Sequence, residues 1–203
     1  LAPTPATAWD FTSARLRERP GQVTLVAIGP LSNVARLLRR HPDAAHLLGG
    51  LVVMGGAVRS PGNVTPHAEF NVYADPLAAH AVLASGVPLT LVGLDATRQA
   101  RVAPEEVARW RPRTPLGRLA RRLLTAWFRT HPDRRHFTLP DPLAVAAAAD
   151  PAVLRTVQGS VRVVPQGTER GRTLFQEGPG PVRAALDVDQ QRLRAVLARL
   201  VVG

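Results

Sequence analysis

The sequence contains no cysteine, and its 26 cationic residues are all arginine, with no lysine. Without cysteine there is no disulfide framework, no thiolate metal site and no thiol nucleophile. Aromatic residues make up only 4% of the chain and are not interleaved with the arginines, so the stacking surfaces typical of a protein that binds single-stranded nucleic acid are missing. No apolar run approaches the roughly 20 residues that a transmembrane helix requires. We therefore expect no membrane partner.

The remaining composition is that of a globular chain with one substantial core. The chain has 203 residues, 45% hydrophobic and 20% charged, with a net charge of +11. A balance this basic normally raises nucleic acid or an anionic surface as a partner. The chain is also rich in Ala, Pro, Gly and Leu, a bias typical of GC-rich coding, and that bias accounts for much of the arginine. Nucleic acid is therefore not the partner that we expect.

The opening segment carries no targeting signal. Nothing near Leu1 resembles a charged stretch followed by an apolar stretch and a cleavage site. The first eleven residues, LAPTPATAWDF, are typical of the interior of a longer protein. We expect a cytoplasmic protein whose single domain, residues 1–203, is incomplete at its N-terminus.

Strand and helix signals alternate along the first half of the chain. Short unbroken apolar runs at 23–28, 51–56 and 87–95 predict strands covered on both faces of a parallel sheet. A helix over 31–41 is stopped by Pro42, and another follows Asp75 at the N-cap and Pro76 at the first helical position, with Gly86 just past its end. These signals predict an α/β fold: a mostly parallel open sheet flanked by helices.

The second half adds helices and hairpin-like strands. Residues 104–128 are helical and strongly basic, and we expect an apolar stripe of Leu116, Leu119, Leu123 and Trp127 to face the core. A further helix begins directly behind Asp141. Alternating strands occupy 157–189, and an amphipathic helix over 190–202 closes the chain.

Polar residues that directly follow the apolar runs are candidates for a ligand site, because open α/β sheets bind ligands beyond the carboxyl ends of their strands. The loop 55–71 brings together Asn63, Glu69 and Asn71, whose amide and carboxylate groups can bind vicinal hydroxyls of a sugar. The alternative is a polar surface loop in which these residues only form turns. Asp95, with Thr97, is interpreted as organising the loop after its strand.

Six segments in order resemble the inosine-uridine-preferring nucleoside hydrolases: AIGPLSNVA (27–35), VVMGGAV (52–58), GNVTPHAEFNVYADP (62–76), LVGLDAT (91–97), DPLAVA (141–146) and ALDVD (185–189). The resemblance implies that Asn63, Glu69 and Asn71 bind the ribose hydroxyls and that Met54 lines the sugar pocket. It further implies a Ca²⁺ held by Asp141 and by the backbone carbonyl of Ile28. The implied reaction is hydrolysis of the N-glycosidic bond of purine or pyrimidine ribonucleosides by a homo-oligomer, a dimer or tetramer.

Two departures from the family pattern bear on catalysis. The aspartate-rich motif DxDxGxDDxxA, which supplies the family's water-activating acid and further calcium ligands, does not occur in this sequence. Pro140 also stands where family members that hydrolyse inosine and uridine usually place a histidine. His136 lies nearby but is more typical of an ordinary exposed residue. We therefore assign no catalytic residue and expect the 203 residues alone to be impaired in hydrolysis.

Competing interpretations stay open at this point. Asp141 is equally suited to be only an N-cap, with Pro142 at the first helical position, and His67 either contacts a ligand or fills the loop. The chain as a whole has an alternative in a non-catalytic, Arg-rich module that binds nucleoside or RNA on the same fold. A plain non-catalytic remnant is a third interpretation.

Overall fold

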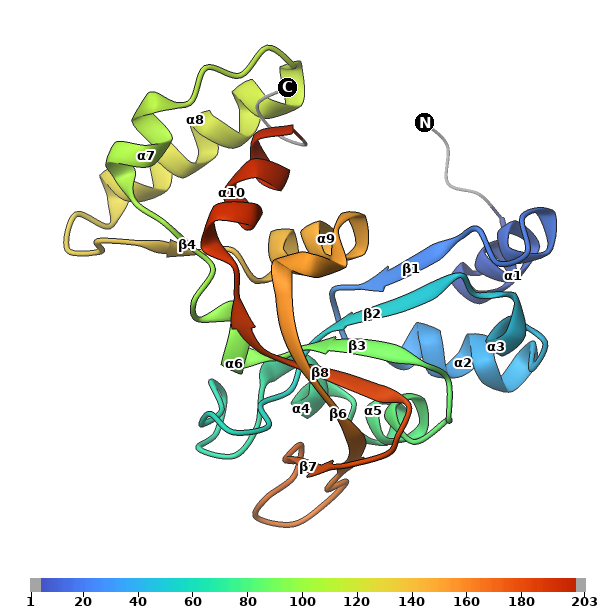
Figure 1. Cartoon of the computed structure of the whole chain (residues 1–203). Helices are drawn as coiled ribbons and strands as arrows, with labels where there is room; N and C mark the ends of the chain where they lie inside the picture. The colour runs from blue at the N-terminus through green and yellow to red at the C-terminus, as the bar shows by residue number, and fades with distance from the viewer. Residues whose placement is uncertain (1–4, 200–203) are drawn as a thin grey trace.

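A six-stranded sheet forms the centre of the computed structural model, which describes residues 5–199 (Figure 1). The strands, in spatial order, are β1 (Thr24–Ala27), β2 (Gly50–Met54), β3 (Leu89–Val92), β8 (Val182–Val188), β6 (Leu154–Val163) and β7 (Thr173–Glu177). The first four are parallel, whereas β6 and β7 are antiparallel to their neighbours. The predicted fold, a mostly parallel sheet flanked by helices, is confirmed.

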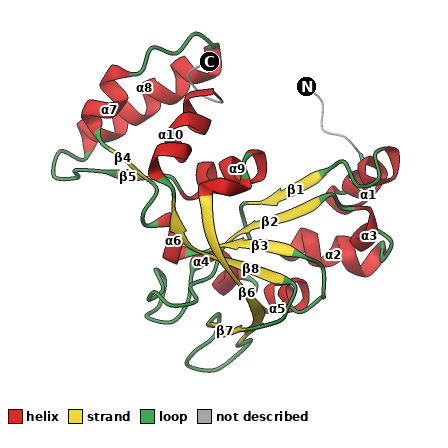
Figure 2. Cartoon of the chain, viewed as in Figure 1, coloured by secondary structure: helices red, strands yellow, loops and turns green. Residues whose placement is uncertain are grey.

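Helices cover both faces of this sheet (Figure 2). They are α1 (Ala8–Glu18), α2 (Ser32–Arg40), α3 (Ala44–Leu47), α4 (Phe70–Ala74), α5 (Pro76–Leu83), α6 (Leu94–Thr97), α7 (Pro104–Arg109), α8 (Pro115–Thr130), α9 (Pro140–Ala149), the 3₁₀ turn η1 (Pro151–Val153) and α10 (Gln190–Leu197). Two short strands, β4 (Arg101–Val102) and β5 (Phe137–Thr138), pair antiparallel beside them. No helix within residues 5–199 has the length and apolar character needed to cross a membrane.

The core is split between the two faces because side chains alternate along each strand. On β2, Val53 packs in the cluster formed with α2 and α5, while Val52 and Met54 pack in the cluster formed with α9 and α10. The cap signals of α5 are confirmed, since Asp75 accepts a hydrogen bond from the Ala78 amide and Pro76 opens the helix. The tertiary structure therefore agrees with the local signals at β2 and α5.

The prediction that the first apolar run is covered on both faces is wrong. In β1, Thr24 is exposed and the other three residues are half-buried, and Ile28, directly after it, is 47% exposed. Among the described strands, β1 pairs only with β2 and lies at the sheet edge. The apolar run therefore predicted a strand correctly but did not predict that the strand lies at the edge of the sheet.

The prediction that an apolar stripe of α8 faces the core is wrong for its three leucines, whereas its fourth member, Trp127, is half-buried against Phe128 and Phe137. Leu116, Leu119 and Leu123 are 68%, 49% and 62% exposed. The neighbouring stripe that carries Leu124 and Phe128 packs against the core instead. A helix with leucines on two adjacent stripes gives no sequence signal that selects one of them for burial.

This difference predicts opposite outcomes for two adjacent leucines. Leu124→Ala is expected to lower the free energy of unfolding by about 1 to 2 kcal/mol, because a half-buried side chain loses its contacts. Leu123→Ala is expected to change it by less than about 0.5 kcal/mol. Urea unfolding of both variants measures these free energies. A larger loss of stability for Leu123→Ala than for Leu124→Ala would mean that the stripe with Leu123 is the one that packs against the core.

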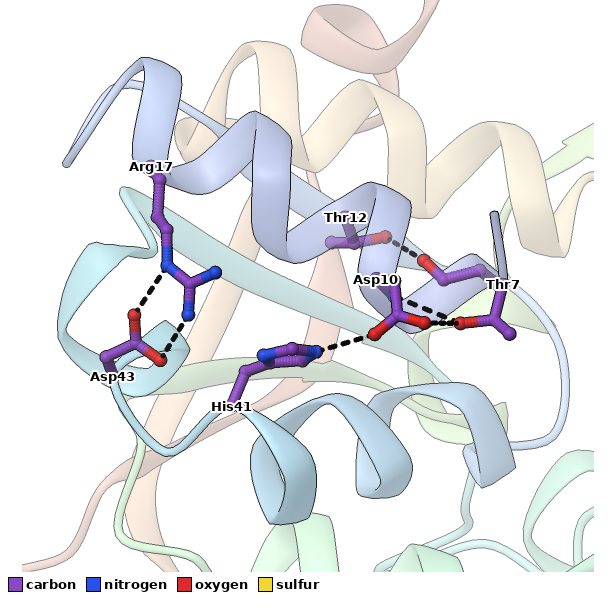
Figure 3. A network of polar contacts seen from close by, with 7 residues as sticks. Thr7, Asp10, Thr12, Arg17, His41 and Asp43 are labelled. Atoms are coloured by element: carbon purple, nitrogen blue, oxygen red, sulfur yellow. Dashed lines mark hydrogen bonds and ion pairs between the residues drawn. The ribbon is translucent and has the colours of Figure 1, made fainter. Parts of the chain in front are cut away.

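Helix α1 was not predicted, and polar contacts fix it to α2 and α3 (Figure 3). Asp10 accepts hydrogen bonds from the Thr7 hydroxyl at 2.6 Å and contacts His41 Nε2 at 2.8 Å. Arg17 forms a two-pronged ion pair with Asp43, at 3.0 and 3.2 Å. The predicted closing helix corresponds to α10, and residues 200–202 of that prediction lie outside the described residues.

Acid is expected to loosen α1 first. The Thr7 hydroxyl, followed by His41, holds the pKa of Asp10 below its ordinary value of 3.8, and Arg17 does the same for Asp43. A lowered folded-state pKa contributes stability above the ordinary value that is lost as pH falls through the folded value. Hydrogen-exchange protection of α1 should therefore drop more than that of β2 and β3 as pH falls from about 5 to below the ordinary value of 3.8. With Asp10→Asn and Asp43→Asn together, this extra pH dependence should vanish.

Candidate functional site

The predicted site residues gather at the carboxyl edge of the parallel strands. Ile28 follows β1, the loop 55–69 follows β2, and α6 follows β3. The C-terminal end of α9, with Ala147 and Ala148, borders a pocket that also contains the amino ends of β1 and β2, at Thr24 and Gly50. Since α9 packs along these strands, its N-terminal turn, which carries Asp141, lies at their carboxyl ends.

Glu69 is the centre of the loop after β2. Its side chain is the N-cap of α4 and is 2% exposed. The carboxylate accepts backbone hydrogen bonds from Asn71 at 2.9 Å, Gly56 at 3.0 Å and Val72 at 3.2 Å. Three charge-assisted bonds compensate the burial of this charge. Glu69 thus connects the end of β2 to the start of α4.

The glycine pair after β2 is required by this close packing. Gly56 has φ +77°, a left-handed conformation that favours glycine. A Cβ at Gly56 would lie 3.1 Å from the Thr173 side chain, and one at Gly55 would lie 3.2 Å from the Glu69 carboxylate. A side chain at either position would require these neighbours to shift by a few tenths of an ångström.

The side-chain amide of Asn71 lies beside Met54 at the end of β2. Its Nδ2 donates to the Met54 carbonyl and contacts the Met54 sulfur, both at 3.2 Å. Because only the nitrogen can donate to a carbonyl, this contact fixes the orientation of the amide. The Oδ1 atom has no hydrogen-bond partner within residues 5–199. It is therefore an acceptor available to a ligand hydroxyl.

Asn63 closes the cluster from the other end of the loop. The side-chain Oδ1 of Asn63 accepts a hydrogen bond from the backbone amide of Phe70 at 3.0 Å. The backbone amide of Asn63 donates to the Ala68 carbonyl at 3.0 Å. The residue is exposed, and its Nδ2 makes no hydrogen bond to any described residue. The structure thus brings together Met54, Asn63, Glu69 and Asn71, with one donor and one acceptor left free.

Asp141 is not an N-cap, so that alternative is wrong. The helix begins one residue earlier, at Pro140, and no side chain caps it. The Asp141 carboxylate has no hydrogen bond or ion pair to any residue in the described range, and partial burial raises its pKa above the ordinary value of 3.8. A partly desolvated carboxylate without a partner is unfavourable unless a ligand or cation meets it.

The described residues do not build a complete metal site. Between residues 5 and 199, no three His, Asp or Glu side chains come together as metal ligands. The carboxylate of Asp141 and the carbonyl of Ile28 are oxygen donors of the kind that Ca²⁺ prefers, but Ca²⁺ takes six to eight such ligands. These two groups form only a fraction of a coordination shell.

No proton donor stands at the start of α9, where Pro140 is the first residue. His136 is exposed and forms no hydrogen bond or ion pair in the described structure. His67 is exposed too, with its Nδ1 3.8 Å from Glu169. Neither histidine contacts the cluster around Glu69 through a hydrogen bond.

The structure adds Asp95 and Thr173 to the residues that shape this site. Asp95 does organise a loop, but it is the loop after β2 and not the one after its own strand, β3, since it accepts hydrogen bonds from the Val58, Arg59 and Ser60 amides. Thr173 was missed. Its hydroxyl bonds both the amide and the carbonyl of Ala57, at 2.9 and 2.6 Å. These partners are 116 residues apart in sequence, so no local pattern reveals their contact.

Comparison with known proteins gives a consistent result. A family model described as inosine-uridine preferring nucleoside hydrolase matches residues 2–195. The pyrimidine-specific ribonucleoside hydrolase RihA of Citrobacter koseri is 38% identical over 209 residues, covering 98% of this chain and 67% of the relative. RihA of Salmonella typhi is 36% identical with the same coverage. The chain therefore spans about two thirds of the length of these relatives.

Solved structures extend the likeness to the fold. A purine-preferring ribonucleoside hydrolase from Gardnerella vaginalis is 30% identical, with a TM-score of 0.90, and the match covers 100% of this chain and 67% of the other. A plant nucleoside hydrolase is 31% identical, with a TM-score of 0.86 and coverage of 100% and 69%. The sheet and helices described above are thus arranged as in these enzymes.

Proposed function

The chain belongs to the inosine-uridine preferring nucleoside hydrolase family, and on that premise we propose that the protein hydrolyses the N-glycosidic bond of ribonucleosides to free base and ribose. The observation that carries the proposal is the cluster of Met54, Asn63, Glu69 and Asn71 at the carboxyl edge of the sheet. It offers one free amide donor and one free amide acceptor to a sugar.

These residues orient the ribose. The Asn71 Oδ1 accepts a hydrogen bond from a ribose hydroxyl, and the Asn63 Nδ2 donates one to a hydroxyl oxygen. Glu69 accepts through the lone pairs that its three amide partners leave unused. Departure of the base leaves positive charge on the sugar ring. A carboxylate and a carbonyl-type oxygen held beside the ring stabilise that charge, because they are fixed in place before the reaction begins.

The family depends on a bound metal, and we propose Ca²⁺ for this member. Asp141 and the Ile28 carbonyl would supply two oxygen ligands. The donor set of the described residues does not fit a complete Ca²⁺ shell, so no step of the reaction is assigned to the ion here. We likewise assign no residue to activate water or to protonate the leaving base.

An assay of ribose release tests this function. Uridine, cytidine and inosine are incubated with the product of the complete reading frame and with the 203-residue chain, each with and without Ca²⁺. We expect ribose from at least one nucleoside with the former, dependent on Ca²⁺, and little or none with the latter. The absence of ribose from every nucleoside with both proteins would overturn the proposed function.

A second candidate function rests on the charge of residues 101–136. This segment has ten arginines against three acidic residues, a net +7 of the chain's +11. No arginine of α8 pairs with a carboxylate in the described part of the chain. This second candidate is that the protein binds RNA without hydrolysing it. An affinity for RNA that falls steeply as the salt concentration rises would support it, and an affinity independent of salt would exclude it.

The remaining expectations for the protein are also proposals. We propose that residues 1–203 form a single domain, that the protein acts in the cytoplasm and that it assembles as a homo-oligomer. The substrate is a small ribonucleoside, in keeping with the small-molecule substrates of this family. Light scattering of the purified protein measures the oligomeric state, and a monomeric mass at micromolar concentration would contradict the assembly.

A further inference from the structure

The carboxylate of Asp95 holds three consecutive backbone amides of the segment that leads to the ribose-binding loop. Oδ2 accepts from the Val58 amide at 2.9 Å, and Oδ1 accepts from the Arg59 and Ser60 amides, both at 2.8 Å. Charge-assisted bonds of this length are strong. The three amides belong to consecutive residues, 58–60, that lie in neither a helix nor a strand.

This carboxylate does not serve its own helix. The N-cap of α6 is Gly93, and no side chain caps that helix. Asp95 also forms no ion pair in the described structure. Its oxygens are therefore directed across to the loop after β2, which lies 35 to 37 residues earlier in the sequence.

Three other side chains fix the same segment at further points. The Glu69 carboxylate accepts from the Gly56 amide, and the Thr173 hydroxyl bonds both polar groups of Ala57. Arg98 Nη2, from the end of α6, donates to the Gly62 carbonyl at 2.9 Å. Every stretch of chain between Gly55 and Asn63 is thus anchored except Pro61.

The link from this segment to Asn63 is stiff. A Cβ at Gly62 would lie 2.2 Å from the Thr65 carbonyl oxygen and 2.3 Å from that of Ala68, so the backbone is packed too closely to absorb a shift. The amides of Gly62 and Asn63 also donate to the carbonyls of Pro66 and Ala68. Only Pro61 and Gly62 separate Ser60 from Asn63, so the hold of Asp95 on residues 58–60 fixes where the chain enters the closely packed turn that carries Asn63.

We propose that Asp95 is a positioning residue for ribose recognition. It sets the place of Asn63 relative to Glu69 and Asn71, and thereby the preference for a sugar that carries its hydroxyls, without touching the substrate. The inference rests on the proposed hydrolysis of ribonucleosides. Misplacement of a binding group by about 1 Å is enough to lower a rate by about 10²-fold, so a loosened loop has a measurable effect.

The test is the preference for uridine over 2′-deoxyuridine in Asp95→Asn. The ratio of kcat/KM for the two substrates does not depend on the fraction of folded enzyme, so a merely structural defect leaves it unchanged. Replacing Oδ2 with an NH₂ group opposes one donor with another at Val58. We expect the ratio to fall about tenfold and the amides of 58–60 to exchange faster. The matched control is Asp189→Asn, another carboxylate that accepts a backbone hydrogen bond but lies at the N-cap of α10.

Each outcome decides the proposal. A lower ratio in Asp95→Asn, with an unchanged ratio in the Asp189 control, supports it. Faster exchange at 58–60 with an unchanged ratio overturns it and leaves Asp95 as a structural residue only. If neither the 203-residue chain nor the product of the complete reading frame releases ribose from any nucleoside, the proposed function fails, and the ratio of the dissociation constants for uridine and 2′-deoxyuridine, measured by calorimetry in the wild type and in Asp95→Asn, then decides the inference. Equal dissociation constants of the wild-type protein for uridine and 2′-deoxyuridine would overturn the inference as well.

Discussion

Glu69→Ala is expected to lower the free energy of unfolding by about 3 to 5 kcal/mol. The substitution leaves the amides of Gly56, Asn71 and Val72 without their acceptor in a site where the side chain is 2% exposed, and each buried unsatisfied donor costs about 1 to 3 kcal/mol. Two of these three bonds are the N-cap of α4, so the loss of the cap is already included in this figure. Since folded proteins are stable by only about 5 to 15 kcal/mol, this loss is a large fraction of the total stability.

Urea unfolding with a matched pair of variants measures this. Glu69→Gln keeps the shape and one acceptor oxygen and should cost roughly half as much, because its NH₂ group faces backbone donors. Glu177→Gln is the control. That glutamate forms an exposed ion pair with Arg59, and its change should stay within about 0.5 kcal/mol. An unfolding midpoint for Glu69→Ala equal to that of the control would mean that the carboxylate does not hold the loop.

Asp141→Asn is expected to abolish most hydrolysis while leaving the fold intact. Outer-shell partners of a metal ligand are worth about 10- to 100-fold, so loss of Asp141, which we propose as a direct ligand, should lower kcat/KM by at least about 10²-fold in the product of the complete reading frame. Stability without metal should not fall, because the substitution removes a partly buried carboxylate whose pKa burial raises and which has no partner in the described residues.

Calcium titration by calorimetry separates the metal from the chemistry. Asp141→Asn should bind Ca²⁺ more weakly than the wild type. Asp150→Asn, at the other end of α9, is the control, since that carboxylate caps η1 and pairs with Arg192. Unchanged Ca²⁺ affinity and unchanged ribose release in Asp141→Asn would remove Asp141 from the site.

Local sequence patterns predicted most of the sheet and several helix boundaries. Three apolar runs became β1, β2 and β3, and Asp75 and Pro76 began α5 as their chemistry requires. These features depend on residues a few positions apart. The loop 55–71 and Asp141 were likewise placed at the correct edge, because parallel strands bring their carboxyl ends together.

Depth of burial could not be predicted in the same way. The run that forms β1 has the pattern of a buried strand but lies at the sheet edge, and Leu123 is exposed while Leu124 packs against the core. Whether an apolar side chain is covered depends on which distant element reaches it. Asp141 illustrates the same limit, because its spacing suited an N-cap and only the start of α9 at Pro140 excluded that role.

By itself, the sequence determined the α/β class and the alternation of elements, because periodicity and capping act between near neighbours, and its family resemblance supplied the residues proposed to bind a sugar. Only the tertiary structure decided how those residues are held. Asp95 and Thr173 reach the loop after β2 from 36 and 116 residues away, and contacts of that range arise from strand pairing and helix packing. Folding decides which side-chain atoms remain without a partner among the described residues, because the buried backbone amides must be hydrogen-bonded first. In this site those atoms are the Nδ2 of Asn63 and the Oδ1 of Asn71.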